Sequence, residues 1–408
     1  MLKTISTDKV RLGMFIQELK GPWIDHPFWK KAFKLQDVSE LRKLKSSVVK
    51  EVVIDTSKGL DVESESAEIS QNSDSNIVVL DQQTQDSVKP NAPVQKRISI
   101  EEEHERAKLI ISESREAVVS MFTDARMGKA VSAEFAMPLV EEISSSVSRN
   151  EGALISLVRL KSQDDYTYMH SVAVCALMVS LARELNLSER EIKQAGLAGL
   201  LHDIGKAAIP LDILNKPGSL NDNEFNLIKM HPEHGHAMLL EGNITDPVAL
   251  DVVLNHHEKI DGTGYPNKLN GDQISLYAKM GAVCDVYDAI TSNRPYKAGW
   301  EPGVSLQRMA QWTNHFDTNV FKAFVKSVGI YPIGSTVILK SGRLGVVVDQ
   351  NSKSLLTPMV KVFFSTKSRT RIPTELIDLS KREVNDKITG HEDPVVWGVT
   401  DVNKLWKE

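Results

Sequence analysis

Residues 195–206 read AGLAGLLHDIGK, an apolar stretch with small residues that ends in an adjacent histidine and aspartate. The stretch predicts a buried helix, and its small side chains let neighbouring helix backbones approach closely. We expect His202 and Asp203 to stand at the end of this helix, where they can converge with side chains from other helices. Taken alone, the pair is better explained as the capped end of an ordinary buried helix, so a functional interpretation depends on the rest of the chain.

Composition divides the chain of 408 residues into five regions. We predict a mainly α fold, in which a helical bundle is flanked by a small α/β or β-rich N-terminal region and by a short β appendage at the C-terminus. A polar segment rich in Ser, Gln, Asn and Asp has too little apolar surface to fold and reads as a flexible linker. The predicted regions are the N-terminal module of regulatory or unknown function (1–60), the linker (61–98), a helical connector (99–149), the main helical domain (150–330) and the β-rich appendage (331–408).

Helix signals are strongest in the two middle regions. Ser99 and Glu102 have the spacing of a capped helix start, and the helices of residues 100–149 are expected to break near Gly128 and Pro138. Two further capping boxes are predicted farther along the chain, and they begin at Ser188 and at Asn221.

Strand signals lie near the two ends of the chain. Apolar residues alternate over Val10–Ile16, which predicts a half-buried strand, and Val52–Ile54 predicts another. In the appendage, Val337–Leu339 and Val346–Val348 flank a Ser-Gly turn and predict a hairpin, and Val360–Phe364 predicts a third strand.

Charge and apolar content limit the possible partners. The formal net charge of −5 argues against bulk electrostatic binding to DNA, RNA or an anionic membrane. The longest apolar stretch, near Val172–Leu181, is shorter than the ~18 residues that a membrane span needs. The N-terminus has no signal-peptide pattern, and the two cysteines, Cys175 and Cys284, read as buried thiols. We therefore predict a cytoplasmic protein without a membrane span.

Histidine and aspartate recur through the main helical domain in a particular order. Imidazole and carboxylate are the usual ligands of zinc, iron, manganese and similar ions. A single histidine is more often packed or solvated than a ligand, but a set of this size in one domain favours a metal site. Asp203 is the natural bridge between two ions, because it adjoins a second ligand. The candidate ligands are His170, His202, Asp203, His231, His256, His257 and Asp285.

Three motifs resemble a known enzyme family. HDIGK at 202–206 resembles the signature of the HD superfamily of metal-dependent phosphohydrolases. HHEKIDGTGYP at 256–266 resembles the longer signature of its HD-GYP branch, and CDVYDAITSNRPY at 284–296 resembles the next block of that branch. The resemblance covers about 150–330. Near the N-terminus, LGMF at 12–15, followed by a tryptophan and HPF at 26–28, is similar to a domain of unknown function that often precedes HD-GYP domains.

The resemblance implies a fold, an activity and roles for individual residues. It implies a five-helix HD core with added helices, and hydrolysis of cyclic di-GMP to pGpG and onward to GMP in some members. Two divalent ions, iron or manganese, would be held by the seven candidate ligands. Two ions rather than three are expected, because Tyr166 stands where some relatives carry a glutamate. The residues to which the resemblance assigns catalysis or substrate binding are Asp203, Lys206, Arg294 and Lys297. Tyr265 is a further candidate for substrate binding, and a partner contact or a purely structural turn explains it as well.

Other interpretations of the same motifs stay open. The enzyme would also fit another cyclic dinucleotide, such as cyclic GMP-AMP, because the motifs do not specify the bases. A non-catalytic receptor or interaction module for a cyclic dinucleotide is the second alternative, although the complete ligand set favours an enzyme. Further expectations are a diguanylate-cyclase domain as a partner at the Gly262–Pro266 loop and a homodimer.

Overall fold

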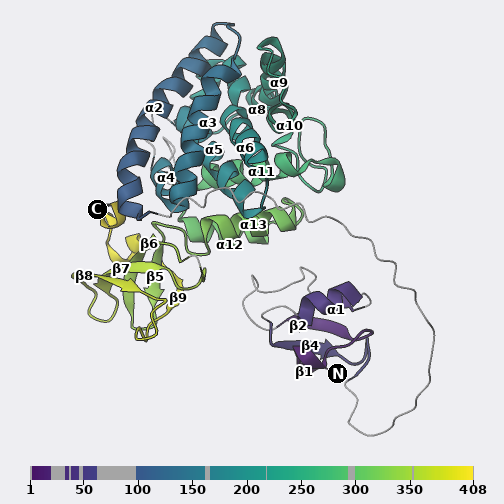
Figure 1. The fold of residues 1–408 in the computed structure, drawn as a ribbon, viewed down its shortest axis with the longest axis vertical. Coiled ribbons are helices and arrows are strands. Elements are labelled where there is room, and N and C mark those ends of the chain that lie inside the picture. Colours follow the sequence, from purple (N-terminus) through teal and green to yellow (C-terminus); the bar gives the residue numbers. More distant parts are fainter. Residues whose placement is uncertain are drawn as a thin grey trace, which may run out of the picture. The chain divides into compact units, whose positions relative to one another are not determined.

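The computed structural model of the protein forms two compact units, Met1–Ala92 and Pro93–Glu408 (Figure 1). The structure describes residues 2–19, 33–35, 38–45, 49–61, 98–160, 166–216, 218–292, 299–351 and 353–407. The HPF motif, almost all of the predicted linker, Arg294, Lys297 and the side chain of Tyr166 lie outside the described residues.

The N-terminal unit contains an antiparallel sheet in the order β1-β4-β2-β3. These strands are β1 (Leu2–Ser6), β2 (Phe15–Leu19), β3 (Phe33–Lys34) and β4 (Glu51–Asp55), and they are joined by η1 (Thr7–Lys9) and α1 (Val38–Lys45). Apolar residues of β2, β4, α1 and the loops between the elements form its core. The strand predicted at Val52–Ile54 is confirmed as β4.

The strand predicted over Val10–Ile16 is wrong for most of its length. Only Ile16 of the alternating residues lies in a strand, and Val10 and Met14 are core residues of the loop that precedes it. The chain turns at Gly13, whose φ of +89° belongs to the left-handed region that glycine adopts readily. The alternation of apolar residues in the sequence therefore arises because every second or fourth residue of a folded loop is buried, and it does not mark a strand.

The second unit is a bundle of helices, which confirms the predicted α class. Helices α5 and α6 pack along each other, and α2, α3, α10 and α11 pack around them (Figure 1). The helices of this bundle are α2 (Ile100–Arg126), α3 (Ala133–Arg149), α4 (Glu151–Val158), α5 (Tyr166–Glu184), α6 (Glu189–Leu201), η3 (Ile204–Ala208), α7 (Leu211–Leu214), α8 (Asp222–Ile228), α9 (His231–Glu241), α10 (Pro247–Asn255), η4 (Gly271–Gln273), α11 (Leu276–Thr291), α12 (Pro302–Gln311) and α13 (Thr318–Val328).

Most of the predicted helix boundaries are confirmed. Ser99 caps α2 by accepting a hydrogen bond from the Glu102 amide, and capping boxes are present at Ser188 and Asn221. The break at Gly128 is confirmed, but the break at Pro138 is wrong, because α3 continues through it. Proline costs that helix one backbone hydrogen bond, and the buried face of α3 around it compensates for the loss.

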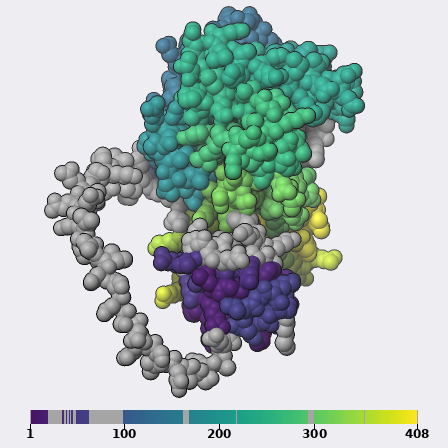
Figure 2. Space-filling model, turned by 90° about the vertical axis from the view of Figure 1, so that its right-hand side faces the viewer, coloured from purple at the N-terminus to yellow at the C-terminus, as the bar shows by residue number. Residues whose placement is uncertain are grey.

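A C-terminal sheet adjoins one end of the bundle (Figure 1), and in the space-filling view yellow C-terminal residues border the green residues of the bundle (Figure 2). Its antiparallel order is β8-β7-β6-β5-β9. Both predicted hairpin strands and the third strand are confirmed as β5, β6 and β7. An apolar cluster that contains Ile100, Ala153, Phe363 and Trp406 joins the sheet to α2 and α4. The elements of this region are β5 (Thr336–Leu339), β6 (Arg343–Asp349), β7 (Met359–Ser365), β8 (Thr370–Asp378), β9 (Ile388–His391), η5 (Pro394–Trp397) and α14 (Val402–Lys407).

Two smaller predictions concern the thiols and the membrane. Cys175 and Cys284 are both buried and free, as predicted. Among the described residues, every helix is too short or too polar to cross a membrane.

Candidate metal centre

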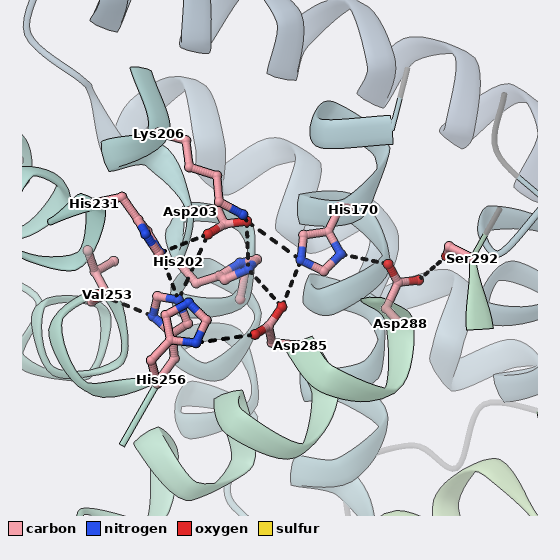
Figure 3. A network of polar contacts seen from close by, with 12 residues as sticks. His170, His202, Asp203, Lys206, His231, Val253, His256, Asp285, Asp288 and Ser292 are labelled. Carbon is pink, nitrogen blue, oxygen red and sulfur yellow. Dashed lines mark hydrogen bonds and ion pairs between the residues drawn. The ribbon is translucent and has the colours of Figure 1, made fainter. Parts of the chain in front are cut away.

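Helix ends deliver most of the candidate ligands to one point in the bundle. His202 ends α6, His256 ends α10, and His231 is the first residue of α9. His170 and Asp285 instead lie within the long helices α5 and α11. The structure therefore brings side chains from five separate helices together, as Figure 3 shows.

Backbone carbonyl groups orient three of the imidazoles. The Nδ1 atoms of His202, His231 and His256 lie 2.8, 2.7 and 2.9 Å from carbonyl oxygens of the preceding helical turn. These contacts assign the N–H to Nδ1, because a carbonyl oxygen only accepts. Each Nε2 atom then carries a lone pair directed at the centre of the cluster, which is the arrangement that metal-binding histidines use.

The seven side chains form two groups that meet at Asp203. In the first group, Asp203, His231, His256 and His257 each offer one ring nitrogen or carboxylate oxygen, and these atoms lie within 4.8 Å of one another. The same holds for one such atom each of His170, His202 and Asp285 in the second group. Asp203 Oδ1 is 3.2 Å from His231 Nε2, whereas its Oδ2 is 3.3 Å from His202 Nε2. One carboxylate thus directs one oxygen at each group, which suits a ligand that bridges two ions.

Asp285 also lies between the two groups. Its Oδ1 is 2.9 Å from His170 Nε2, and its Oδ2 is 3.7 Å from His257 Nδ1. His202 and Asp203 are almost fully buried, and His257 is the most exposed of the five imidazoles. The pair of aspartates therefore supplies two negative charges to a site from which water is largely excluded.

Burial and charge set the protonation states of these groups. Burial, followed by the neighbouring imidazoles of His257 and His202, holds the pKa of His256 well below its usual value. Burial likewise lowers the pKa of His257 to about 3. Burial opposes ionisation of Asp203, but Lys206 and His202 outweigh it and keep the pKa of that carboxyl well below its usual range. Neutral imidazoles beside ionised carboxylates are the forms that bind metal ions.

Unsatisfied polar atoms show that the donor set fits a cation. His202 Nε2 and Asp203 Oδ1 are buried and make no hydrogen bond among the described residues. His231 Nε2 and His256 Nε2 lie 3.3 Å apart, although both carry lone pairs in the tautomers assigned above. Buried polar atoms without partners cost free energy. A divalent cation would accept the lone pairs of the unpaired atoms and would separate the two facing Nε2 lone pairs by binding between them.

Lys206 and Tyr265 lie at the edge of the cluster. The ammonium group of Lys206 contacts Asp203 Oδ2, and Arg126 anchors this segment by donating to the Lys206 and Ile209 carbonyl oxygens. The ring of Tyr265 stacks on His257, with 4.6 Å between the ring centroids. Both predicted substrate contacts within the described residues are therefore next to the predicted ligands.

Two glycines allow the ligands to come this close. A Cβ atom on Gly205 would lie 1.9 Å from the carbonyl oxygen of His231, so that glycine permits η3 to touch α9. A Cβ atom on Gly264 would lie 2.5 Å from the Cα atom of Glu258. Glu258 is buried and accepts hydrogen bonds from the amides of Asn267 and Leu269. The glutamate of the HHE sequence therefore braces the loop and does not face the cluster.

Asp288 contacts a predicted ligand, and the sequence analysis missed it. Its Oδ2 accepts a hydrogen bond from His170 Nδ1, with 2.6 Å between the two atoms, and its Oδ1 accepts a hydrogen bond from Ser292. Burial alone would lower the pKa of His170, but its hydrogen bonds with Asp285 and Asp288 outweigh burial and raise it. The available signal was the spacing of three residues from Asp285, which places both carboxylates on one face of α11.

Comparison with known proteins identifies the family. The HD domain family matches residues 148–320, and a domain of unknown function, DUF3391, matches residues 2–136. The chain is 53% identical over 407 residues to a cyclic di-GMP phosphodiesterase of Pseudomonas aeruginosa, a match that covers 100% of this chain and 96% of the relative. The chain belongs to the HD-GYP family of metal-dependent phosphodiesterases.

Two further relatives match only part of the chain. A cyclic di-GMP phosphodiesterase response regulator of Xanthomonas campestris is 41% identical over 36% of this chain and 39% of its own length. A 3'3'-cGAMP-specific phosphodiesterase of Vibrio cholerae is 35% identical over 46% of this chain and 42% of its own length. The N-terminal unit is therefore shared with the Pseudomonas relative, whose match spans the whole chain.

Proposed function

We propose that this protein hydrolyses cyclic di-GMP to pGpG, and onward to GMP, with two divalent ions held by the seven clustered side chains. The observation that carries the proposal is the position of Asp203, which directs one carboxylate oxygen at each of the two ligand groups. A bound pair of ions would lower the pKa of water and stabilise charge on the phosphoryl oxygens. Iron or manganese suits a set of imidazoles and carboxylates.

The chain's own residues orient the reaction around that centre. Lys206 is the half-buried cation next to Asp203, and its ammonium group can shift to a phosphoryl oxygen as negative charge builds up there. Tyr265 stacks on His257, the most exposed of the imidazoles, where its ring would restrict how a nucleotide enters. We assign phosphate binding to Arg294 and Lys297 as well, from the family motif alone.

The choice of cyclic di-GMP over another cyclic dinucleotide rests on the relatives. The relative that matches the whole chain at 53% identity is named for cyclic di-GMP, whereas the cGAMP-specific relative matches less than half at 35%. A non-catalytic receptor is disfavoured, because receptors have no need for a complete ligand set. The cytoplasmic location, the homodimer and a diguanylate-cyclase partner at the Gly262–Pro266 loop stay predictions.

One experiment tests the metal centre and the reaction together. We expect purified full-length protein to hold about two divalent ions per chain by elemental analysis, and to convert cyclic di-GMP to pGpG by mass spectrometry. His231→Ala should lose metal and turnover. His236→Ala is the matched control, because this half-buried histidine lies on the same helix outside both ligand groups, and it should keep both properties. Protein that carries two ions and leaves cyclic di-GMP intact would refute the proposal.

A further inference from the structure

One face of α8 leads from the protein surface to the edge of the metal centre. Phe225 and Lys229 are four residues apart and therefore share this face. Lys229 Nζ lies 4.6 Å from the centroid of the Phe225 ring and 5.7 Å from that of Tyr265. Tyr265 in turn stacks on His257. An aromatic ring, a cation and a second aromatic ring thus form a continuous row that ends at a predicted metal ligand.

The two side chains that begin this row are only partly buried. The Phe225 side chain is 45% exposed, so its ring gains little from burial. Lys229 has no carboxylate partner within the part of the chain that the structure describes, and its ammonium group lies over the faces of two rings. In contrast, Lys206 is already paired with Asp203. Lys229 is therefore a cation at the rim that remains available for a ligand.

The substrate's chemistry matches this row. A cyclic dinucleotide has two phosphates and two purine bases, and only one phosphodiester can occupy the centre at a time. The other phosphate and the bases must then extend over the rim of the site. Exposed aromatic rings bind bases by stacking, and a nearby lysine supplies the charge that binds a phosphate.

We propose that Phe225 and Lys229 form a subsite in which a purine base stacks on the phenyl ring and the ammonium group binds the phosphate that is not cleaved. The subsite rests on the proposed function, because it requires a dinucleotide at the metal centre. It discriminates a cyclic dinucleotide from a small phosphodiester by adding contacts away from the reacting phosphorus. Such contacts act on substrate binding and leave the metal ions in place.

A purely structural role for Lys229 makes a different prediction. Lysine at the end of a helix interacts favourably with the helix dipole, and loss of that interaction would lower stability without changing substrate preference. The distinguishing measurement is therefore the ratio of kcat/KM for cyclic di-GMP to kcat/KM for bis(p-nitrophenyl) phosphate, which lacks bases and a second phosphate.

The test uses Phe225→Ala and Lys229→Met in the metal-loaded, full-length protein. We expect each variant to lower that ratio about tenfold or more, through a higher KM for cyclic di-GMP, while metal content is unchanged. Lys229→Arg should recover most of the ratio, because it retains the charge. Leu227→Ala is the matched control: Leu227 is 41% exposed on the same helix, but two residues from Phe225 it points away from that face.

Two results would overturn the subsite. Unchanged ratios in Phe225→Ala and Lys229→Met would show that the row does not contact the substrate. Equal losses on both substrates, with lost metal, would show that the variants damage the centre itself. Failure of the proposed function is a separate result, in which the wild-type protein cleaves the small diester but leaves cyclic di-GMP intact.

Discussion

Two buried polar networks in the helical unit differ in how completely their atoms are paired. In the first, the fully buried carboxylate of Glu103 accepts hydrogen bonds from Ser146 at 2.7 Å and from Arg149 Nε and Nη2, both at 2.8 Å. In the second, the metal centre, Asp203 Oδ1 and His202 Nε2 are buried without a hydrogen bond among the described residues. Both carboxylate oxygens of Glu103 therefore have hydrogen-bond partners, whereas the metal centre contains buried ligand atoms that have none among the described residues.

This difference separates a polar network that supports the fold from one that supports chemistry. The Glu103 network ties α2 to α3, and a two-pronged pairing between guanidinium and carboxylate gives it strength and direction. Unpaired buried atoms are costly, so a protein retains them where a ligand completes the set. We therefore expect substitutions in the centre to remove activity with the fold intact, and substitutions in the Glu103 network to remove stability with the centre intact.

The largest effect is expected for Asp203→Ala. Loss of the carboxylate that faces both ligand groups should lower kcat/KM by at least about a thousandfold and lower the metal content. Helical circular dichroism should stay at the wild-type level, because among the described residues the Asp203 side chain pairs with Lys206 and with the other candidate ligands. Wild-type activity in this variant would show that the bridging assignment is wrong.

The opposite result is expected for Glu103→Ala. Removal of one partner leaves Arg149 without its carboxylate, which should lower the free energy of unfolding by about 3 kcal/mol in urea titrations. The folded fraction should keep wild-type kcat/KM and metal content. The matched control is Glu105→Ala on the same helix, because Glu105 pairs with Lys108 at the surface, where water screens the charges. Equal losses of stability in both variants would contradict the comparison.

The sequence predicted the centre better than its surroundings, for physical reasons. His202, His231 and His256 stand at helix ends, where adjacent polar residues interrupt an apolar pattern and are visible as motifs. Phe225 and Lys229 carry no such signal, because their significance depends on which helix face borders the site. Strand β8 was also missed, since most of its residues are exposed and its sequence lacks the apolar alternation of a half-buried strand.

Asp288 has a smaller expected effect, because it acts through His170. The carboxylate accepts a hydrogen bond from Nδ1, so Nε2, which lies 2.9 Å from Asp285 Oδ1, carries the lone pair that would bind a metal ion. Carboxylates in this position typically contribute ten- to a hundredfold to metal affinity or activity. Asp288→Ala should therefore lower metal affinity by about that factor in a chelator titration, and excess metal should recover most of kcat/KM.

Ser292→Ala sharpens this last prediction. Ser292 donates to the other oxygen of Asp288, at 3.2 Å, so its removal leaves the contact with His170 in place. Metal affinity in Ser292→Ala should stay close to that of the wild type. If Asp288→Ala loses activity that excess metal does not recover, then Asp288 takes part in the reaction beyond orienting His170. In that case Asp288 belongs to the metal centre itself, together with Asp285 of the same helix, α11.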